Sequence, residues 1–370
     1  MRVPNVRSQR GIALVVAIVA LVVIGAIVAG TFFISSMEQK TAENTVATAL
    51  AQQAAEAGLQ KTIANWQPAY NTLATNAATA LARDSVYGGT YFDVTVSRMS
   101  PNFFLVRSAG TFGGSTQTLA AVLRFIQANP DVGGAVTAHG NVQIGGNATV
   151  TGANTAPPNW SCSAAADKAG VRTDGTVTTN GNSFTLTGNP PKIENDPTVT
   201  DATFQTPFQQ LRRMATLTLA GGSYNGMAPT TTGSPATCNK ANTLNWGEPW
   251  RPPTGGTVVQ CTSYAPVILF TSDAHLSNGR GQGVLLVDGD LQLSGNFEFT
   301  GLVITTGQVR TTGTGNKISG AVMAQAVNLG DQTSFLGNPT VAYSRCALDW
   351  VLQQAAVAKP VAGRGWTQMF

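Results

Sequence analysis

Charged side chains are scarce in this sequence of 370 residues, and they make up only 11% of it. The formal net charge is +4, and part of that excess lies in a short N-terminal segment. Charge alone therefore predicts no strong attraction for polyanions such as nucleic acids. Glycine is plentiful by contrast, with 40 residues, which favours β-rich domains with many turns. The length allows two or three such domains, each with its own core.

Residues that carry catalysis or bind metal ions are also few. The two histidines, His139 and His275, lie far apart in the sequence and form no metal-ligand pattern. No nucleophile elbow, phosphate-binding loop or calcium-binding nonapeptide occurs. We therefore expect no enzymatic activity, no catalytic residues, no cofactor and no metal site. The alternative is a polysaccharide-active β-helix in which Asp273, Asp288 and Asp290 act as acids and bases, although aspartate also favours turns.

No charged residue interrupts residues 11–34, a mostly aliphatic run that is long enough as a helix to cross a bilayer core. Arg2, Arg7 and Arg10 precede the run, and basic residues beside a first span stay on the cytoplasmic side. We expect a single membrane span with everything after it outside the cytoplasm. The alternative is a removable secretory signal that ends near Ala29, although such apolar cores usually run about 7–15 residues.

The helix is predicted to continue beyond the apolar run. Residues 38–66 are rich in Ala, Gln, Leu and Glu and contain no proline. A helix over residues 11–66 would be about 80 Å long, at ~1.5 Å per residue. Its first half would lie in lipid, and its second half would pack on a folded head. Within the span, Ala26 and Gly30 have the spacing that lets helices approach closely in a membrane.

Only four cysteines are present, and no two of them have the spacing of a zinc knuckle or a redox motif. All four follow the membrane span, so we expect them outside the cytoplasm, where disulfides persist. Three pairings are possible for Cys162, Cys238, Cys261 and Cys346. We prefer a bridge from Cys238 to Cys261, because it would close a loop around a proline-rich stretch.

Two stretches of the long helix carry a resemblance to type IV pilin-like proteins. Residues 10–16, RGIALVV, resemble their basic leader, terminal glycine and apolar start. Residues 51–59, AQQAAEAGL, and the later residues 110–114, GTFGG, resemble PilX-type minor pilins. The resemblance implies that prepilin peptidase cuts between Gly11 and Ile12, so that Ile12 becomes the first mature residue.

One departure from the family pattern concerns the fifth mature position. Major pilins carry a glutamate there, which in such families pairs with the terminal amine of a neighbouring subunit, whereas this chain has Val16. The resemblance therefore implies a minor subunit that initiates or caps a fibre. It also implies an inner-membrane location, with assembly into a pilus at the cell surface. The implied partners are prepilin peptidase, other pilins and the inner-membrane assembly machinery.

The sequence after the helix predicts an antiparallel sheet. Residues 71–83 form an Ala-rich stretch, which we predict to be a short helix. Apolar and polar residues then alternate along residues 91–97, 103–109 and 119–125, and turn residues separate these strands. Three strands laid on the long helix would complete a pilin-like α+β head.

A glycine repeat governs much of the remaining sequence. Glycines recur about every six residues in three sets: Gly134, Gly140, Gly146 and Gly152; Gly175, Gly181 and Gly188; and Gly289, Gly295, Gly301, Gly307 and Gly313. Each glycine would permit a corner between short strands, and stacked strands would bury a continuous core. We therefore predict an all-β solenoid over residues 131–345, with an irregular insertion over residues 189–283 that includes a short helix. Its inward residues should include Leu291, Leu293, Phe297, Phe299, Val303, Val309 and Ile318.

The irregular insertion carries the candidate ligand contacts. They are basic and aromatic residues that, if exposed, would touch a sugar or a nucleic acid base: Arg212, Arg213, Trp246, Trp250 and Arg251. The alternative is that they serve only local packing and solvation. Resemblance to large competence pilins of the ComZ type implies DNA as the ligand, and a surface glycan is the other ligand that we consider. A fixed envelope anchor or adhesin outside any fibre is a further alternative.

The predicted organisation is therefore α+β at the N-terminus and all-β beyond it. From the N-terminus, the predicted parts are a leader (1–11), a membrane-spanning and extended helix (12–66), a sheet head (67–130), the solenoid with its insertion (131–345), and a capping helix with a tail (346–370). We expect Trp366 in that tail to dock.

Overall fold

The computed structural model describes residues 12–181, 183–252, 259–325, 332–361 and 366–369. The chain divides into two compact units. The first unit consists of the residues up to Asn65, Ala74–Arg124 and the residues from Pro360 onward. The second unit consists of Trp66–Leu73 and Phe125–Lys359. Gly11, at the predicted cleavage site, lies outside the described residues.

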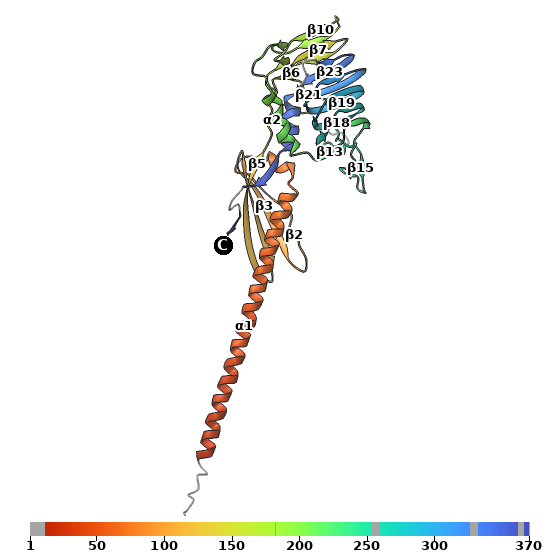
Figure 1. The fold of residues 1–370 in the computed structure, drawn as a ribbon. Coiled ribbons are helices and arrows are strands. Elements are labelled where there is room, and N and C mark those ends of the chain that lie inside the picture. The colour runs from red at the N-terminus through yellow and green to blue at the C-terminus, as the bar shows by residue number, and fades with distance from the viewer. Residues whose placement is uncertain (1–11, 182, 253–258, 326–331, 362–365, 370) are drawn as a thin grey trace, which may run out of the picture. The chain divides into compact units, whose positions relative to one another are not determined.

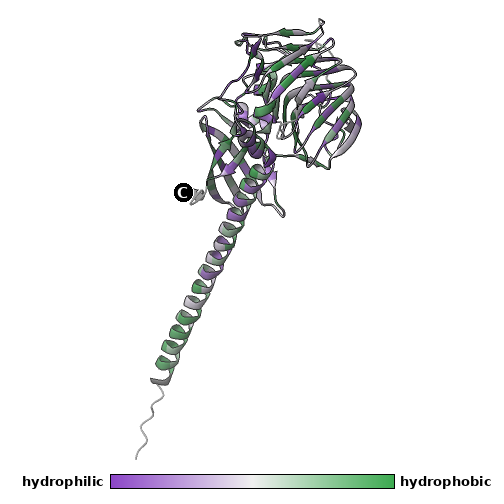
Figure 2. Ribbon diagram, turned by 45° about the horizontal axis from the view of Figure 1, so that its top comes forward, coloured by the Kyte–Doolittle hydropathy of each residue, from purple (hydrophilic) through white to green (hydrophobic). Residues whose placement is uncertain are grey.

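The first unit is built on α1 (Ile12–Ala64), a single helix of 53 residues (Figure 1). No proline interrupts it, so its backbone hydrogen bonds continue without a break. From Leu14 to Ile34 its side chains are uncharged and exposed, and Phe32 is 73% exposed. Figure 2 shows the hydrophobic residues in green along this half of the helix. As the sequence predicted, α1 is long and apolar enough to cross a membrane.

The strands of the first unit are antiparallel. They are β1 (Ala78–Ala80), β2 (Asp84–Ser85), β3 (Tyr91–Ser100), β4 (Phe103–Phe112), β5 (Ser115–Ile126) and β25 (Trp366–Met369). The order is β1, β3, β4 and β5, with β2 also on β3 and β25 also on β5. Val106 on the central strand lies opposite Val96 and Ala121, which confirms the three predicted strands. The backbone of Trp366 pairs with Ala121, so part of the tail extends the sheet.

Small residues bring α1 and the antiparallel sheet into close contact. Ala51 and Ala55 of the helix are buried. A Cβ added to Gly110 of β4 would lie only 2.0 Å from the carbonyl oxygen of Ala51, so the two backbones meet directly at this point. A Cβ added to Gly58 would lie 2.4 Å from Ser108 Oγ. The segments that resemble minor pilins therefore have a packing role within this unit.

The predicted helix over residues 71–83 is wrong. Its first residues belong to the 3-10 helix η1 (Pro68–Thr72), and Ala78–Ala80 form β1. Asn76 has a left-handed φ of 69°, which is incompatible with a right-handed helix. The helix propensity of alanine is a weak preference, and the pairing of β1 with β3 outweighs it.

Parallel strands that pair in register dominate the second unit. β17 (Val267–Phe270), β18 (Ala274–Val287), β19 (Leu291–Thr305) and β21 (Thr314–Gln325) pair in that order. Figure 1 shows β18, β19 and β21 in succession. Apolar residues at one register position form a buried column across these strands: Ile268, Leu285, Val303 and Val322.

The earliest strands of this unit in the chain do not lie at an edge of the parallel sheet. β6 (Gly134–His139) pairs with β21 on one side and with β9 (Ala169–Thr173) on the other. Val136 and Val171 extend the apolar column. The order in space is therefore β13, β17, β18, β19, β21, β6 and β9. The glycine-rich regions before and after the predicted insertion thus belong to one sheet.

The path of the chain explains this order. From β6 the chain runs outward to β12 (Lys192–Ile193), which pairs with β9. The helix α2 (Asp201–Arg212) then leads to β13 (Leu217–Leu219), which pairs with β17 at the other side of the sheet. The later strands return to the middle, where β21 meets β6. The chain therefore both joins and leaves the parallel sheet near its centre.

Further short elements complete the second unit. They are β7 (Asn141–Gly145), β8 (Thr149–Thr151), β10 (Val177–Asn180), β11 (Thr185–Thr187), β14 (Gly222–Met227), β15 (Thr231–Thr232), β16 (Thr237–Cys238), β20 (Val309–Thr311), β22 (Gln332–Phe335), β23 (Asn338–Tyr343) and α3 (Arg345–Ala355), which β24 (Val357–Pro360) follows. Ser344 caps α3 by accepting a hydrogen bond from the Ala347 N–H. The predicted helix near the C-terminus is therefore confirmed, and Val351 on it is buried.

The irregular segment is shorter than the predicted insertion over residues 189–283. β12 pairs with β9, and β13 and β14 pair with β17 and β18, so five strands that lie wholly or partly in this range belong to the parallel sheet. Their glycines and short lengths hide the alternating pattern.

The predicted inward residues are all buried: Leu291, Leu293, Phe297, Phe299, Val303, Val309 and Ile318.

Three glycines form a column at one register position. Gly283, Gly301 and Gly320 lie on β18, β19 and β21 with φ values of 125°, 139° and 149°. A Cβ on Gly301 would lie 2.0 Å from the Gly283 carbonyl oxygen, and one on Gly320 would lie 1.9 Å from the Gly301 carbonyl oxygen. Only glycine fits these positions without displacing the backbone of the next strand.

Candidate functional site

One helix surface and two grooves are candidates for function, and the exposed surface of α1 is the first. Within the described residues, the side chains from Leu14 to Ile34 contain no charge, and they are exposed all round the helix. A helix that is apolar on every face is stable only in lipid or among other apolar helices. A Cβ added to Gly25 or Gly30 would meet nothing within 4 Å, so no contact within the chain requires these glycines.

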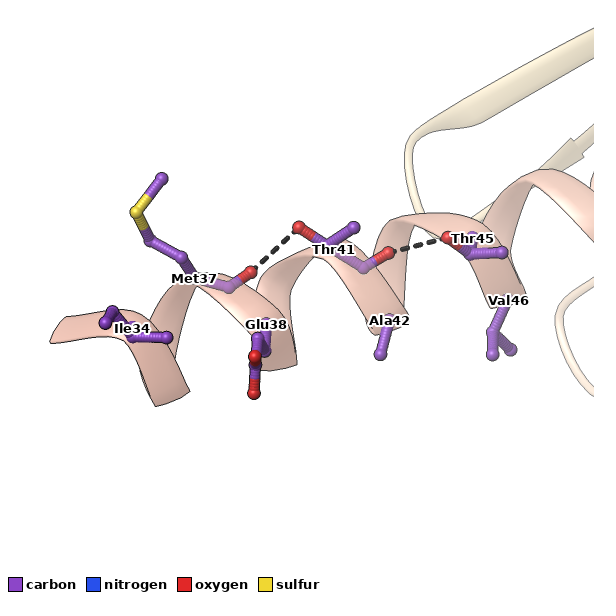
Figure 3. A pocket seen from close by; sticks show the side chains of 7 residues that line it. All are labelled: Ile34, Met37, Glu38, Thr41, Ala42, Thr45 and Val46. Atoms are coloured by element: carbon purple, nitrogen blue, oxygen red, sulfur yellow. Dashed lines mark hydrogen bonds between the residues drawn. The ribbon is translucent and has the colours of Figure 1, made fainter. Parts of the chain in front are cut away.

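The exposed surface continues along α1 to Val46, as Figure 3 shows. The hydroxyls of Thr41 and Thr45 donate at 2.8 Å to carbonyl oxygens one turn earlier, so they make no demand on a partner. Ile34 and Met37 add apolar area, and Glu38 is the one charged residue among the seven drawn. One helix face encloses no cavity, so this surface suits another helix rather than a small ligand.

Trp246, one of the five predicted ligand contacts, is buried. Its exposed fraction is 0%, and its ring lies edge-on to Phe270 and Phe297 at centroid distances of 6.1 and 6.2 Å. Its indole N–H donates to the Thr243 carbonyl oxygen at 3.0 Å. Trp246 is therefore not a ligand contact, and the alternative of local packing holds for it, because its ring packs against Phe270 of β17 and Phe297 of β19.

Arg212 and Arg213 lie at the end of α2. Arg212 forms an ion pair with Asp288 at 2.9 Å, whereas Arg213 is exposed and has no ion-pair partner among the described residues. Asp290 accepts hydrogen bonds from both the backbone and the side-chain nitrogen of Gln308. Asp288 and Asp290, considered above as acids and bases, thus bind neighbouring groups at the corners of the sheet.

Arg251 lies between two tryptophan rings. Its guanidinium carbon is 4.3 Å from the ring centroid of Trp160 and 5.0 Å from that of Trp350. It also donates to the Glu248 carbonyl oxygen at 2.6 Å and to Gln282 Oε1 at 3.1 Å. Burial lowers the pKa of Arg251 to about 10, although the Glu248 carboxylate acts in the opposite direction. Arg251 therefore stays charged at neutral pH and serves internal contacts.

Two disulfides surround this arrangement. Cys238 joins Cys261, the pairing that we preferred, with a Cα–Cα distance of 4.9 Å. Cys162 joins Cys346 with a Cα–Cα distance of 5.6 Å. The second bridge links the loop that carries Trp160 to the helix α3. It therefore restrains both of the elements whose tryptophans enclose Arg251.

Trp250 differs from its neighbours because it is 45% exposed. Its backbone is nevertheless fixed on both sides. The Trp250 N–H donates to the carboxylate of buried Glu248 at 3.1 Å. The carbonyl oxygens of the two flanking residues accept hydrogen bonds from Trp160 Nε1 at 2.8 Å and from Asn159 Nδ2 at 2.9 Å. The exposed ring is thus carried by a well-fixed segment.

A shallow groove of about 60 Å³ lies beside Trp250. Besides Pro158, Pro249 and Trp250, residues of three parallel strands line it: Arg280 from β18, Glu298, Phe299 and Thr300 from β19, and Lys317 and Ser319 from β21. Glu298 pairs with Lys317 at 3.4 Å, and Arg280 makes a two-pronged contact with the Glu248 carboxylate, with a shortest distance of 2.8 Å. The groove therefore combines an aromatic surface with charges that are already paired.

Sequence reasoning missed a second groove of about 320 Å³ on the parallel sheet. Its polar lining includes Asp273, His275, Asp290, Gln292 and Arg310. The strands β18, β19 and β20 place His275, Gln292 and Arg310 at one register position. Aligning the glycine repeats with each other in the sequence would have shown that these outward-facing residues form a row.

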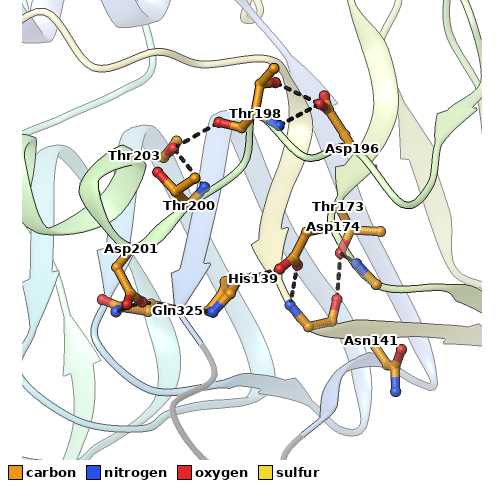
Figure 4. A network of polar contacts seen from close by, with 12 residues as sticks. His139, Asn141, Thr173, Asp174, Asp196, Thr198, Thr200, Asp201, Thr203 and Gln325 are labelled. Atoms are coloured by element: carbon orange, nitrogen blue, oxygen red, sulfur yellow. Dashed lines mark hydrogen bonds and ion pairs between the residues drawn. The ribbon is translucent and has the colours of Figure 1, made fainter.

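Figure 4 shows a polar network around His139. His139 Nδ1 lies 2.6 Å from an Asp174 carboxylate oxygen, and its Nε2 lies 3.7 Å from Asp201, the first residue of α2. Gln325 donates to the same Asp201 oxygen at 2.7 Å. The network fastens the start of α2 where β6 meets β21. In the described ranges, no group of three His, Cys, Asp or Glu side chains is arranged to hold a metal ion.

Comparison with known proteins assigns no family to this chain. No protein-family model matches the chain, and no curated protein matches it. Among solved structures, one similar chain is the competence-associated pilin ComZ from Thermus thermophilus, with 12% sequence identity and a TM-score of 0.28. The alignment covers 87% of this chain and 97% of that one. At this TM-score the likeness carries no argument, so function must be argued from the residues themselves.

Proposed function

We propose that this chain is a pilin-like subunit, which α1 holds first in the inner membrane and then in a type IV pilus or a related fibre. The continuity of α1 carries the proposal. One helix of 53 residues combines an exposed apolar half with a half that packs on an antiparallel sheet. A plain membrane anchor requires only about 20 apolar residues. The additional length suits a spine that joins a head to a bundle of similar helices.

The surface of α1 favours other pilin helices as its partners. Gly25 and Gly30 leave open space on the helix, and small residues let membrane helices approach closely. The stretch from Ile34 to Val46 offers apolar area, and its threonine hydroxyls are already hydrogen-bonded within the helix. We infer that neighbouring subunits cover both surfaces after the assembly machinery takes the subunit from the membrane.

We further infer a minor subunit of the PilX type. Val16 is an exposed apolar side chain at the position where a major pilin has glutamate. A helix without that carboxylate requires no neighbouring amine, which suits a subunit that begins or caps a fibre. The segments 51–59 and 110–114 pack against each other, which supports a pilin-like head.

We interpret the second unit as a β-solenoid that makes contact with a surface or with DNA. The apolar column through Leu285 and Val303 and the glycine column through Gly301 support successive, stacked turns of chain. Such a unit offers a long, regular face for an extended ligand. We propose no enzymatic role, since Asp288 and Asp290 are occupied as partners of neighbouring residues.

The first test concerns processing. Intact-mass measurement should find a mature chain that begins at Ile12, because the proposal makes residues 1–11 a leader for prepilin peptidase. Gly11→Val should abolish the cut, since a bulkier residue would occupy the cleavage position, while membrane insertion persists. A mature chain that begins near Gly30 would instead indicate a secreted protein and would contradict the proposal.

The second test concerns the fibre. Pili sheared from cells and purified should contain this protein in small amounts relative to the main pilin, and cells with Gly11→Val should yield pili without it. A control membrane protein followed in the same fractions would detect contamination. If the processed protein remains wholly in the membrane fraction of cells that make pili, it is a fixed envelope anchor.

A further inference from the structure

We propose that the groove beside Trp250 binds an uncharged, extended glycan. The inference rests on the proposed function, because it names the chemical class of ligand for surface contact. It starts from an exposed tryptophan that the fold does not require to be exposed. Trp246, four residues earlier, shows that this segment can bury an indole completely. A large aromatic surface left in water is unfavourable unless a ligand covers it.

The exposure of Trp250 does not arise from a loose segment. Glu248 fixes the Trp250 N–H, and Trp160 and Asn159 hold the carbonyl oxygens on either side. Arg280 in turn holds Glu248 through a two-pronged ion pair. A ring on a backbone fixed in this way loses little conformational entropy on binding, which is the property of a prepared binding surface.

The charges in the groove argue against a polyanion. Arg280 is paired with Glu248, and Lys317 is paired with Glu298, so these four residues sum to zero. Arg251 is enclosed by rings and hydrogen bonds. Binding of nucleic acid derives most of its affinity from free cations that displace counterions. A ligand that offers hydroxyl groups can instead donate to the carboxylates and accept from the cations without breaking either pair.

The flat face of a pyranose ring matches the aromatic surface. Its C–H groups form an apolar patch that stacks on an indole, and its rim carries hydroxyls for the polar floor. Thr300 and Ser319, which also line the groove, supply hydroxyls at one register position of β19 and β21. A nucleobase would stack equally well, but among the described residues that line the groove its phosphates would find no unpaired cation.

The ligand should be a chain of sugars because the polar floor continues along the sheet. One partly or fully exposed polar side chain per strand lies in register across six strands: Arg280, Glu298, Lys317, Thr340, Thr149 and Thr185. At ~4.8 Å between strands, this row is about 24 Å long. A single sugar would cover only the end beside Trp250.

Full-length protein in detergent can be tested against immobilised neutral hexasaccharides of glucose, xylose and N-acetylglucosamine. We expect at least one of them to bind more tightly than its disaccharide, with an affinity that barely changes between about 50 and 200 mM salt. Trp250→Ala should weaken that binding about tenfold or more, because stacking on an aromatic ring is lost. Trp250→Phe should retain most of it.

Matched controls separate binding from folding and from assembly. Tyr87→Ala removes an exposed aromatic residue of the first unit and should leave glycan affinity unchanged. Trp250→Ala should keep the melting temperature of the native protein, and it should still be processed and recovered in pili. A result that contradicts glycan binding would therefore leave the proposed function as a pilin-like subunit untouched. No binding to any neutral hexasaccharide, or salt-sensitive binding to duplex DNA or polygalacturonate that needs Trp250, would overturn the inference.

Discussion

Gly301→Ala is expected to destabilise the parallel-sheet unit by about 2–6 kcal/mol. The change forces a non-glycine residue into a φ of 139°, which costs about 1–3 kcal/mol. The new methyl group would also lie 2.0 Å from the Gly283 carbonyl oxygen, so the strands must separate or shift. Overpacking of this kind typically costs a further ~1–3 kcal/mol. Denaturant unfolding followed by tryptophan fluorescence measures the loss.

Gly222→Ala is the matched control for this change. Gly222 has nearly the same φ, 136°, but a Cβ there would meet nothing within 4 Å. It should therefore show only the backbone strain, about 1–3 kcal/mol. The difference between the two variants isolates the close approach of β18 and β19. Equal losses would mean that Gly283 and Gly301 do not lie on adjacent strands in register.

Phe299→Asp is expected to be at least as damaging. Phe299 is 1% exposed, and its ring stacks on Phe297 at a centroid distance of 6.2 Å. The substitution removes a large apolar side chain, which costs about 3–5 kcal/mol, and places an unpaired carboxylate in the core. A thermal melt should show a large decrease in melting temperature or no cooperative transition.

Glu298→Ala, one residue earlier on the strand, supplies the control. The Glu298 side chain is 50% exposed, and its pair with Lys317 is a surface ion pair worth at most about 1 kcal/mol. The melting temperature should change little. Because neighbouring residues on a strand point to opposite faces, similar decreases for the two variants would disprove the inward and outward assignment.

The sequence predicted those features that depend on local pattern. The apolar run and the absence of proline predicted α1, and alternation predicted β3, β4 and β5. The glycine period predicted which side chains of β19 are buried, among them Phe299 and Val303. Each of these depends on residues that are close together in the chain, so the relevant free energy can be judged from a short segment.

Features that depend on distant partners were missed. Periodicity shows which residues of a strand point inward, but it does not show which strand lies beside it, so the pairing of β6 with β21 was not foreseen. Trp246 lies in a stretch without periodicity, and only the contact with Phe270 and Phe297 explains its burial. Likewise, β1 exists because β3 pairs with it, against the helix propensity of its alanines.

The path of the chain through the parallel sheet decides how this unit responds to pulling. Tension peels a sheet strand by strand when an edge strand is also a chain end. Here the edge strands β12 and β13 lie inside the chain and are connected through α2, while the chain joins the sheet at β6, beside β21. The chain leaves the sheet at β23, which pairs with β21 and β8, so tension between the two ends of this unit acts on central strands rather than on an edge strand. If this unit contacts a surface as proposed, it would resist unravelling under tension until the central strands separate.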